Sequence, residues 1–326
     1  MLEVRDAPDP TPLDGEVRIR VAGAGVNFAD LSARAGLYPD APPAPMVVGY
    51  EVAGTVDVLG PGVEGLAPGD PVMAITRFGG YSDLVCVPRH QVARLHEGAN
   101  LVSAAGIPVT YLTSYLMLNR IGSVRAGDTV LIHSAGGGVG LSALQLAKNL
   151  GATVIGTASA RKHESLAARG LDHAIDYRTA DFETEVMRLT DGRGVDVVLD
   201  AQGGKSFRKS YRCLAPMGRL FCFGFAAANA PTRLKAVRTL PRAMAQTPLF
   251  HPMQLMNANK GVFGINMGHL WSESALIGES LATLAAMWQA GEIDPVIDST
   301  YPFDKAHDAH SRLEEARNFG KVVLVP

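Results

Sequence analysis

The sequence predicts an α/β protein with a mostly β first domain and a second domain built on a doubly wound parallel sheet. Three observations carry this prediction: a length of 326 residues, short β-like segments up to about residue 94, and a later stretch where strand and helix patterns alternate. We expect residues 1–106 and 268–326 to build the first domain and residues 107–267 to build the second.

The composition is that of an ordinary globular protein. Charged residues make up 19% and hydrophobic residues 47%, and the net charge of −2 provides no basic field for nucleic acid. The three cysteines, Cys86, Cys213 and Cys222, form no C-x-x-C pair, which excludes a disulfide framework and a four-cysteine zinc site. No apolar run is long enough to span a bilayer, and the first ten residues lack the apolar core of a signal peptide. We therefore expect a cytoplasmic protein without nucleic-acid partners or membrane association.

Glycine and proline punctuate the first domain. Between them lie the β-like segments "VRIRVAGAGV", "EVAGTVDVLG", "DPVMAI" and "SDLVCVP", and the proline-rich "YPDAPPAPMV" is predicted to be an extended loop. Near the end of the chain, "HDAHSRLEE" places His307, His310 and Glu314 on one helix face. This set lacks a further metal ligand, so it is predicted to be a solvated face.

Strands and helices alternate through the second domain. Strand-like segments such as "DTVLIHSA", "ATVIGTAS", "HAIDY" and "VDVVLDAQG" are separated by predicted helices over 139–150, 162–169, 182–190 and 207–214. This order predicts a parallel sheet with helices on both faces. After a long helix over 272–290, the final "GKVVLVP" is predicted to fold back as a strand onto the first domain.

A glycine-rich turn joins the first of these strands to its helix. It reads G-x-G-x-x-G with alanine in the first place, and the candidate binding residues are Ala135, Gly137, Gly138, Val139 and Gly140. Glycine lets the backbone approach a pyrophosphate, and the helix N-terminus offers unpaired N–H groups to it. The turn therefore predicts a dinucleotide site.

The end of the second strand favours NADPH as the dinucleotide. An NAD site places an acidic residue about 20 residues after the turn, to hold the ribose 2′-hydroxyl. Here that position carries no acid, and Ser159, Arg161 and Lys162 offer a hydroxyl and two cations to a 2′-phosphate.

Several motifs together resemble the medium-chain dehydrogenase/reductase superfamily, in its zinc-free quinone oxidoreductase branch. They include "GVNFADL", "RAGLYP", "GYEVAGTV", "HSAGGGVG", "GRGVDVVLD" and the terminal "GKVVLVP". Three stretches are similar to the vesicle amine transport protein homologues of that branch: "GTASARKHE", "IDYRTADF" and "MQLMNANKGVFGINMGHL".

The resemblance carries expectations of its own. It implies a GroES-like β domain and a Rossmann domain with the active site in the cleft between them, bound NADPH, and a homodimer paired through the strand near 261–265. Family members usually have one or two further strands before "LEVRDAP", so the first domain is expected to be truncated or its start misassigned. It also implies that Thr113 lies near the nicotinamide amide and Tyr177 near the adenosine phosphate, and Gly224 and Asn318 complete the expected cofactor contacts.

The segment "VGYEVAG" bears on the chemistry. Zinc members of the superfamily carry a cysteine where this chain has Asn27 and a histidine where it has Tyr50, so no metal site is expected. A reductase without a Lewis acid needs an electron-poor acceptor, and neutral donors then hold the developing oxyanion. The candidate donors are Asn27, Tyr38 and Tyr50, although packing alone also explains both tyrosines. Asp30 is expected to cap a turn.

The leading functional hypothesis is an NADPH-dependent reductase of quinones or α,β-unsaturated carbonyls. A 2-enoyl thioester reductase is the alternative enzyme, because such domains share the "NF-x-D" and "G-x-YP" motifs. A binding protein with a trafficking or membrane role is a third hypothesis. For it, the basic stretch with Arg233, Lys235, Arg238 and Arg242 would be a surface helix, but Pro241 interrupts it and a helical insertion beside the cleft is favoured.

Overall fold

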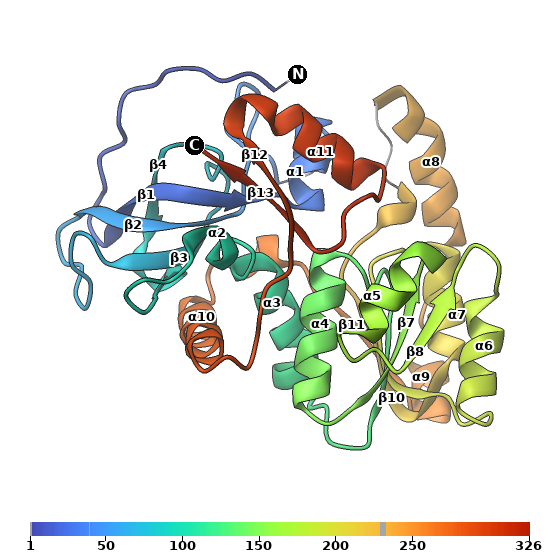
Figure 1. The fold of residues 1–326 in the computed structure, drawn as a ribbon. Helices are drawn as coiled ribbons and strands as arrows, with labels where there is room; N and C mark the ends of the chain where they lie inside the picture. Colours follow the sequence, from blue (N-terminus) through green and yellow to red (C-terminus); the bar gives the residue numbers. More distant parts are fainter. Residues whose placement is uncertain (1, 39, 229–232) are drawn as a thin grey trace. The chain divides into compact units, whose positions relative to one another are not determined.

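The computed structural model describes residues 2–38, 40–228 and 233–326, and its side chains are described outside 228–238. The chain forms two compact units, residues 1–112 with 267–326, and residues 113–266. Each unit is described by itself below, with the elements labelled as in Figure 1.

A seven-stranded sheet organises the first unit. Its strand order is β12-β13-β1-β2-β3-β5, and β4 also pairs with β1. The strands are β1 (Glu16–Gly25), β2 (Glu51–Leu59), β3 (Pro71–Ile75), β4 (Leu84–Pro88), β5 (Val92–Arg94), β12 (Ile297–Pro302) and β13 (Lys321–Val325). Alternating β1 residues such as Val17, Ile19 and Val21 point into the core, as expected for a strand with one buried face.

The C-terminal strand completes this sheet. β13 lies antiparallel to β1, with Ala24 opposite Leu324, so the two ends of the sequence meet in one sheet. The helices of this unit are α1 (Phe28–Arg34), α2 (Leu101–Ala104), the first part of α3 (Pro108–Tyr115), α10 (Ser274–Gln289) and α11 (Ala306–Glu314). The pairing brings the start of β13 beside the loop that follows β1.

Six parallel strands form the sheet of the second unit. Their order is β11-β10-β9-β6-β7-β8, and every neighbouring pair is parallel. The strands are β6 (Thr129–Ile132), β7 (Thr153–Ala158), β8 (His173–Asp176), β9 (Val195–Asp200), β10 (Leu214–Cys222) and β11 (Gly261–Gly264). The strand order reverses between β6 and β9, and at such a switch point a doubly wound sheet binds its ligand.

Helices connect these strands. They are α4 (Gly138–Asn149), α5 (His163–Ala167), α6 (Phe182–Leu189), α7 (Lys205–Arg212), α8 (Arg233–Gln246) and α9 (Pro252–Ala258). α7 begins two residues earlier than predicted, directly after the left-handed Gly204 (φ 57°). The prediction that Pro241 interrupts the basic helix was wrong: α8 runs through Pro241, because a proline removes only one backbone donor from a helix that can continue around it.

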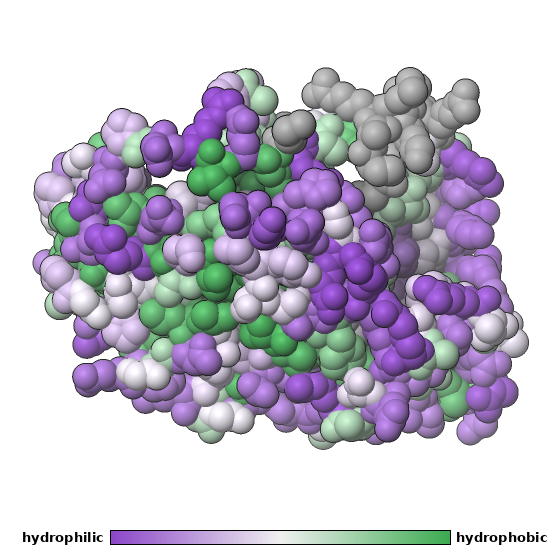
Figure 2. All heavy atoms as spheres, turned by 45° about the horizontal axis from the view of Figure 1, so that its top comes forward, coloured by the Kyte–Doolittle hydropathy of each residue, from purple (hydrophilic) through white to green (hydrophobic). Residues whose placement is uncertain are grey.

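Ion pairs tie α6 to α7 on the surface. Arg212 pairs with Glu183 at 2.5 Å, and Lys209 pairs with Asp181. In Figure 2, hydrophilic residues cover most of the right-hand edge of the molecule, the side on which Figure 1 draws these two helices. Across the described ranges, no helix is both long enough and apolar enough to cross a membrane.

Candidate functional site

The glycine-rich turn lies at the carboxyl end of β6, next to the switch point. Gly137 is the N-cap of α4, and the first hydrogen bond inside the helix runs from Leu141 N–H to the Gly137 carbonyl at 2.9 Å. The N–H groups of Gly138, Val139 and Gly140 precede this bond and, as in any α-helix, have no acceptor within the helix. The turn therefore presents the donors that an anionic group needs.

Gly140 keeps the turn close to its helix. A Cβ at this position would lie 2.4 Å from the Ser134 carbonyl oxygen and 2.6 Å from that of Ala135. Both obstacles are backbone atoms, so no side-chain movement would relieve the contact. Ala135 is fully buried, and its N–H donates to the Thr157 carbonyl at 3.0 Å, which fixes the turn to β7.

The ends of β7 and β8 bring the next candidates together. Ala158 is opposite Asp176 in the parallel register, so Ser159 and Tyr177 follow side by side at the same edge of the sheet. Ser159 is buried, Arg161 is exposed and Lys162 is half-buried. Tyr177 is exposed, and the Arg178 guanidinium lies 5.9 Å from the centre of its ring. Arg178 is a cation that sequence reasoning did not select, although it directly follows a chosen residue.

The remaining cofactor candidates come from three different parts of the chain. Thr113 is buried on α3, and the adjacent Ser114 hydroxyl donates to the Val139 carbonyl at 3.2 Å, which places this helix beside the start of α4. Gly224 lies exposed just beyond β10, in the second unit. Asn318 belongs to the first unit, where its amide donates to the Gly320 carbonyl at 2.8 Å.

A closed polar triad lies in the first unit. The Asn27 amide donates to Glu51 Oε1 at 2.8 Å, and Lys321 Nζ donates to Asn27 Oδ1 at 2.6 Å and also pairs with Glu51 Oε1. Glu51 Oε2 accepts the Val109 N–H at 2.7 Å. The Lys321 and Glu51 side chains are 4% and 0% exposed, so this is a buried ion pair with most of its bonding capacity met.

The triad also explains why residue 25 is a glycine. A Cβ on Gly25 would lie 2.4 Å from Glu51 Oε1, so the carboxylate occupies the space that a side chain would need. The Asn27 amide donates to the Gly25 carbonyl as well, at 3.3 Å. Because both amide hydrogens of Asn27 already have acceptors, its geometry is that of a residue that orients the triad.

A second buried chain runs beside the triad. As expected, Asp30 caps the turn: its Oδ2 accepts the Asn27 N–H at 2.8 Å, and its Oδ1 accepts the Gly49 N–H at 2.9 Å. The Tyr81 hydroxyl donates to Asp30 Oδ2 at 3.2 Å and lies 3.1 Å from His310 Nε2. Burial raises the pKa of Asp30 to about 7, against the lowering effects of these N–H groups and of Lys321.

The prediction of a solvated helix face was wrong for His310. This imidazole is fully buried, and burial together with nearby Arg34 and His307 lowers its pKa to about 3. The hydrophobic residues Ala306, Ala309 and Leu313 of the same helix pack into the core and carry His310 inward with them. Sequence periodicity alone could not separate it from its exposed neighbour His307.

Tyr38 and Tyr50 belong to an aromatic cluster. Their ring centres are 5.9 Å apart in an edge-on arrangement, and Phe78 lies 4.8 Å from Tyr50. The Tyr50 hydroxyl is buried and makes no hydrogen bond of ordinary geometry to the described residues, although Tyr38 is close enough to influence it. Burial, and then the neighbouring Tyr38, raise the pKa of Tyr50, so its hydroxyl stays protonated.

Two family profiles match the chain. The profile described as "Alcohol dehydrogenase GroES-like domain" matches residues 13–97, and that described as "Zinc-binding dehydrogenase" matches residues 169–324. The "Synaptic vesicle membrane protein VAT-1 homolog" of Rattus norvegicus is 41% identical over 329 aligned positions, covering 100% of this chain and 80% of the relative. The chain belongs to the medium-chain dehydrogenase/reductase superfamily. It is an oxidoreductase of that superfamily, with a GroES-like domain and a Rossmann domain, which confirms the predicted fold class.

Solved structures of the superfamily share this fold along almost the whole chain. A quinone oxidoreductase from Pseudomonas syringae is 30% identical with a TM-score of 0.86, covering 99% of this chain and 95% of that one. A mycobacterial protein in complex with NADPH is 32% identical with a TM-score of 0.85 and the same coverage. The CurK enoyl reductase is 28% identical with a TM-score of 0.84, covering 98% of this chain and 94% of that one.

A metal ion does not fit the residues at Asn27 and Tyr50. An ammonium group sits on Asn27 Oδ1 and on the only carboxylate of the triad, so a divalent cation there would be repelled by Lys321. Neither an amide nor a protonated phenol is a ligand that zinc prefers. Within the described ranges, no three His, Cys, Asp or Glu side chains gather in a way that could hold a metal ion.

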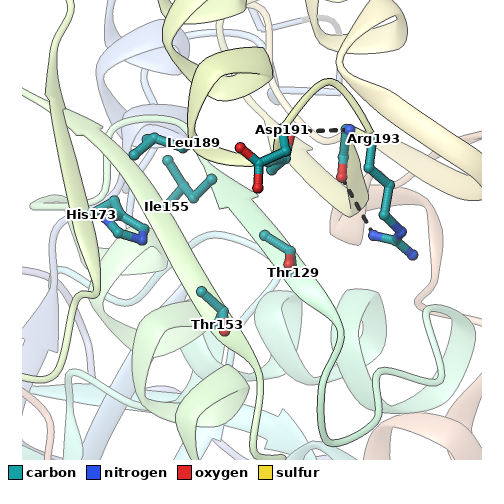
Figure 3. Close-up of a pocket in the computed structure, with 9 residues that line it drawn as sticks. Thr129, Thr153, Ile155, His173, Leu189, Asp191 and Arg193 are labelled. Atoms are coloured by element: carbon teal, nitrogen blue, oxygen red, sulfur yellow. Dashed lines mark hydrogen bonds between the residues drawn. The ribbon is translucent and has the colours of Figure 1, made fainter.

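A cavity of about 200 Å³ lies at the opposite end of the second unit's strands. Thr129 and Thr153 line it at the starts of β6 and β7, with Asp191 and Arg193 across from them (Figure 3). The Arg193 guanidinium is already paired with Asp196 at 2.6 Å. Because the glycine-rich turn lies at the carboxyl ends of the strands, this cavity is separate from the candidate dinucleotide site.

The sequence did not indicate two residues of the candidate site, Glu51 and Lys321. Glu51 directly follows Tyr50, and Lys321 opens the final strand, but their partnership spans 270 residues of sequence. The only sequence hint was that a charged residue begins each of these two buried strands. The side chains of Arg233, Lys235 and Arg238, proposed for a basic surface helix, lie outside the described residues, whereas Arg242 is exposed.

Proposed function

We propose that this chain is an NADPH-dependent reductase of quinones or α,β-unsaturated carbonyls that works without a catalytic metal. The observation that carries the proposal is the buried Lys321 ammonium, held between Asn27 and Glu51 where zinc members carry a metal ligand. Because no Lewis acid then polarises the acceptor, the acceptor itself has to be electron-poor. The similarity to a quinone oxidoreductase supports the same class of substrate.

The cofactor assignment rests on the second unit. The open N–H groups at the start of α4 suit a pyrophosphate, and Ser159, Arg161 and Lys162 follow the strand whose end would hold the adenosine ribose. No acidic side chain occupies the end of β7 to bond a 2′-hydroxyl. Similar solved structures include one in complex with NADPH and one of an NAD-dependent alcohol dehydrogenase, so they support a nicotinamide cofactor, and the choice of NADPH rests on the residues that follow β7.

When bound, NADPH supplies the hydride, and a proton from water completes reduction of a quinone to a hydroquinone or of an enone to a saturated carbonyl. The protein's part is to hold the acceptor's oxygen as it gains charge. Tyr50 has a protonated hydroxyl without a described hydrogen-bond partner, and Tyr38 lies next to it, so we assign the donor role to these two side chains. Asn27 orients the triad that it forms with Glu51 and Lys321.

A 2-enoyl thioester reductase is the second candidate, favoured by the similarity to the CurK enoyl reductase. The two candidates share the hydride step and differ in the acceptor, because a thioester carries a long acyl-carrier arm. An assay with matched acceptors separates them: 9,10-phenanthrenequinone, trans-2-hexenal, a 2-enoyl thioester of N-acetylcysteamine and a saturated aldehyde.

The test follows nicotinamide absorbance with NADPH or NADH, with and without a chelator. We expect chelator-insensitive, NADPH-selective reduction of the quinone or the enal, with the saturated aldehyde untouched. Preferential turnover of the thioester would support the second candidate. Tight NADPH binding without turnover of any acceptor would overturn both and favour a binding protein, for which flotation with anionic liposomes then tests membrane attachment.

We also propose that the chain works as a homodimer through β11. This strand ends the parallel sheet, its Phe263 is 46% exposed, and Met253 and Met256 are exposed on the preceding α9. An apolar edge strand of this kind invites pairing with a second copy. Light scattering should show a dimer that Phe263→Glu converts to a monomer, whereas Val4→Glu, also at an exposed apolar residue, leaves the mass unchanged.

A further inference from the structure

A hydrogen-bonded chain of four buried polar side chains, His133, Thr157, Ser210 and Asp200, lies next to the glycine-rich turn. His133, the residue after β6, has Nδ1 3.1 Å from Thr157 Oγ1 and Nε2 3.0 Å from Ser210 Oγ. Ser210 donates to Asp200 Oδ2 at 2.7 Å. All four side chains are buried, and they connect β6, β7, α7 and the end of β9. None of them is among the residues that the glycine-rich motif predicts.

The contacts at the two hydroxyls determine where each hydrogen lies. The Ser134 N–H donates to Thr157 Oγ1 at 3.3 Å, so the hydroxyl hydrogen of Thr157 is available to His133 Nδ1. Since Ser210 gives its own hydrogen to Asp200, its oxygen accepts from His133 Nε2. The imidazole is therefore neutral, with its hydrogen on Nε2. Burial lowers the pKa of His133, and the nearby Asp200 only partly opposes that effect.

The hydrogen-bond chain joins two turns at the carboxyl ends of the strands. One is the glycine-rich turn, where Ser134 has a left-handed backbone (φ 56°) and its carbonyl accepts the Gly137 N–H at 2.9 Å. The other follows β9, where Asp200 Oδ1 accepts the Gln202 N–H at 2.6 Å. The Gln202 side-chain amide donates to Ser134 Oγ at 2.8 Å, which links the two turns a second time, directly.

This arrangement is not a hydrolytic triad, despite its Ser, His and Asp. The Ser210 hydroxyl donates to the carboxylate rather than to the imidazole, and the serine is fully buried. A serine nucleophile would need the opposite polarity and an open approach. The role that remains is to hold backbone.

We propose that His133 is a positioning residue for the dinucleotide: through Thr157 and Ser210 it fixes the glycine-rich turn relative to the turn after β9. The proposal rests on the proposed use of NADPH. It assigns to a buried histidine a share of the cofactor affinity that the glycine-rich motif would otherwise carry alone. A turn that is already rigid loses less conformational entropy when the ligand binds. Breaking the hydrogen-bond chain should therefore weaken NADPH affinity without removing any contact to the cofactor.

The chain offers a matched pair of serines to test this. Ser206 and Ser210 lie on the same helix, and each donates to Asp200 Oδ2 at 2.7 Å, but only Ser210 also contacts His133. Ser210→Ala should raise the NADPH dissociation constant about tenfold, and Ser206→Ala less than about twofold, as expected when a network and not a single bond is broken. The titration follows nicotinamide fluorescence.

Thr157 provides a second pair of variants. Thr157→Val keeps the shape and removes the hydroxyl that joins Ser134 to His133, whereas Thr157→Ser keeps that hydroxyl. We expect Thr157→Val to weaken NADPH binding about as much as Ser210→Ala does. Thr157→Ser should bind NADPH about as tightly as the wild type. Denaturant unfolding of all four variants separates general instability from the change in affinity.

A readout without cofactor is the tautomer of His133. In ¹⁵N-histidine spectra of the apo protein, assigned by loss of the signal in His133→Asn, we expect a neutral ring protonated at Nε2 across neutral pH. A ring protonated at Nδ1, or at both nitrogens, would overturn the hydrogen-bond chain. Equal effects of the two serine variants on affinity would overturn the positioning role alone. If the wild-type protein binds neither NADPH nor NADH, the proposed function fails as well.

Discussion

The two units of this protein build their candidate sites in different ways. In the second unit, backbone N–H groups at the start of α4 and neutral side chains beneath them form the site. In the first unit, the site rests on titratable groups taken out of water: the Lys321–Glu51 ion pair, and Asp30 with its hydrogen bond from Tyr81. A site made of backbone N–H groups requires that the ligand can approach the turn closely. A buried ion pair requires that both of its partners are present.

This difference predicts different kinds of failure. Removing one member of a buried ion pair leaves the other charge without compensation, so the loss falls on the stability of the fold. Adding an atom to a tight backbone turn forces the backbone to shift, which also displaces the N–H groups that face the ligand. The following variants test the contrast, beginning with the largest expected effect.

Lys321→Met should be the most damaging change. It leaves Glu51 buried without its cation, and breaking a buried pair in this way costs about 3–5 kcal/mol of unfolding free energy. Denaturant titration measures the loss. The control is Lys321→Met combined with Glu51→Gln, which removes both charges and should recover most of the stability. If the double variant is no more stable than the single one, charge pairing is not what holds this site.

Gly140→Ala should weaken cofactor binding as well as strain the fold. Its Cβ would meet two backbone carbonyls at 2.4 and 2.6 Å, so the turn has to shift away from the pyrophosphate position. We expect the NADPH dissociation constant to rise about 100-fold, comparable with losing two or more charge-assisted hydrogen bonds. Gly278→Ala, in α10, meets nothing nearer than 3.4 Å and serves as the control. Unchanged NADPH affinity in Gly140→Ala would contradict the assignment of this turn.

Asp30→Asn should change how stability depends on pH. The folded state keeps the Asp30 proton up to a pKa of about 7, while the unfolded chain releases it near its ordinary value of 3.8. This contribution is therefore complete below pH 4 and is lost as the pH rises through 7, by at most about 1.4 kcal/mol per pH unit. Unfolding free energies between pH 5 and 7 should fall more steeply for the wild type than for Asp30→Asn. Parallel curves would show that Asp30 is ionised in the fold.

Arg161→Ala should have the smallest effect and the most selective one. We expect KM for NADPH to rise about tenfold and KM for NADH to change less than about twofold, because a guanidinium–phosphate contact is lost only with the phosphorylated cofactor. Arg169→Ala is the control, an exposed arginine at the end of the same segment. A similar change in KM for both cofactors, or for both arginine variants, would show that the 2′-phosphate does not bind at Arg161.

The sequence was most informative where function depends on local spacing. The residues 135–140 specified the strand–turn–helix of the second unit, because glycine spacing and helix start are properties of neighbouring residues. The same holds for two of the four helices predicted there: α4 and α6 begin and end within one residue of the predicted bounds. Two predictions missed: α8 continues through Pro241, and core packing of Ala306, Ala309 and Leu313 carries His310 inward on their helix.

The first unit was less accessible to sequence reasoning. Asn27 and Tyr50 were identified by the absence of metal ligands, but nothing in the pattern indicated that a lysine 294 positions away would contact Asn27. That contact exists because β13 pairs with β1 and delivers Lys321 to the end of the sheet. Likewise, the hydrogen-bond chain through His133 depends on Ser210, which lies 77 residues further along.

The sequence by itself therefore determined the two folds, the glycine-rich turn and the superfamily, because periodicity, turn residues and motif spacing are local. Only the tertiary structure decided which side chains meet: Lys321 with Asn27 and Glu51, and His133 with Thr157 and Ser210. The physical reason is that hydrogen bonds and buried ion pairs act over a few ångströms. Residues far apart in the chain reach that distance only once the strands have paired.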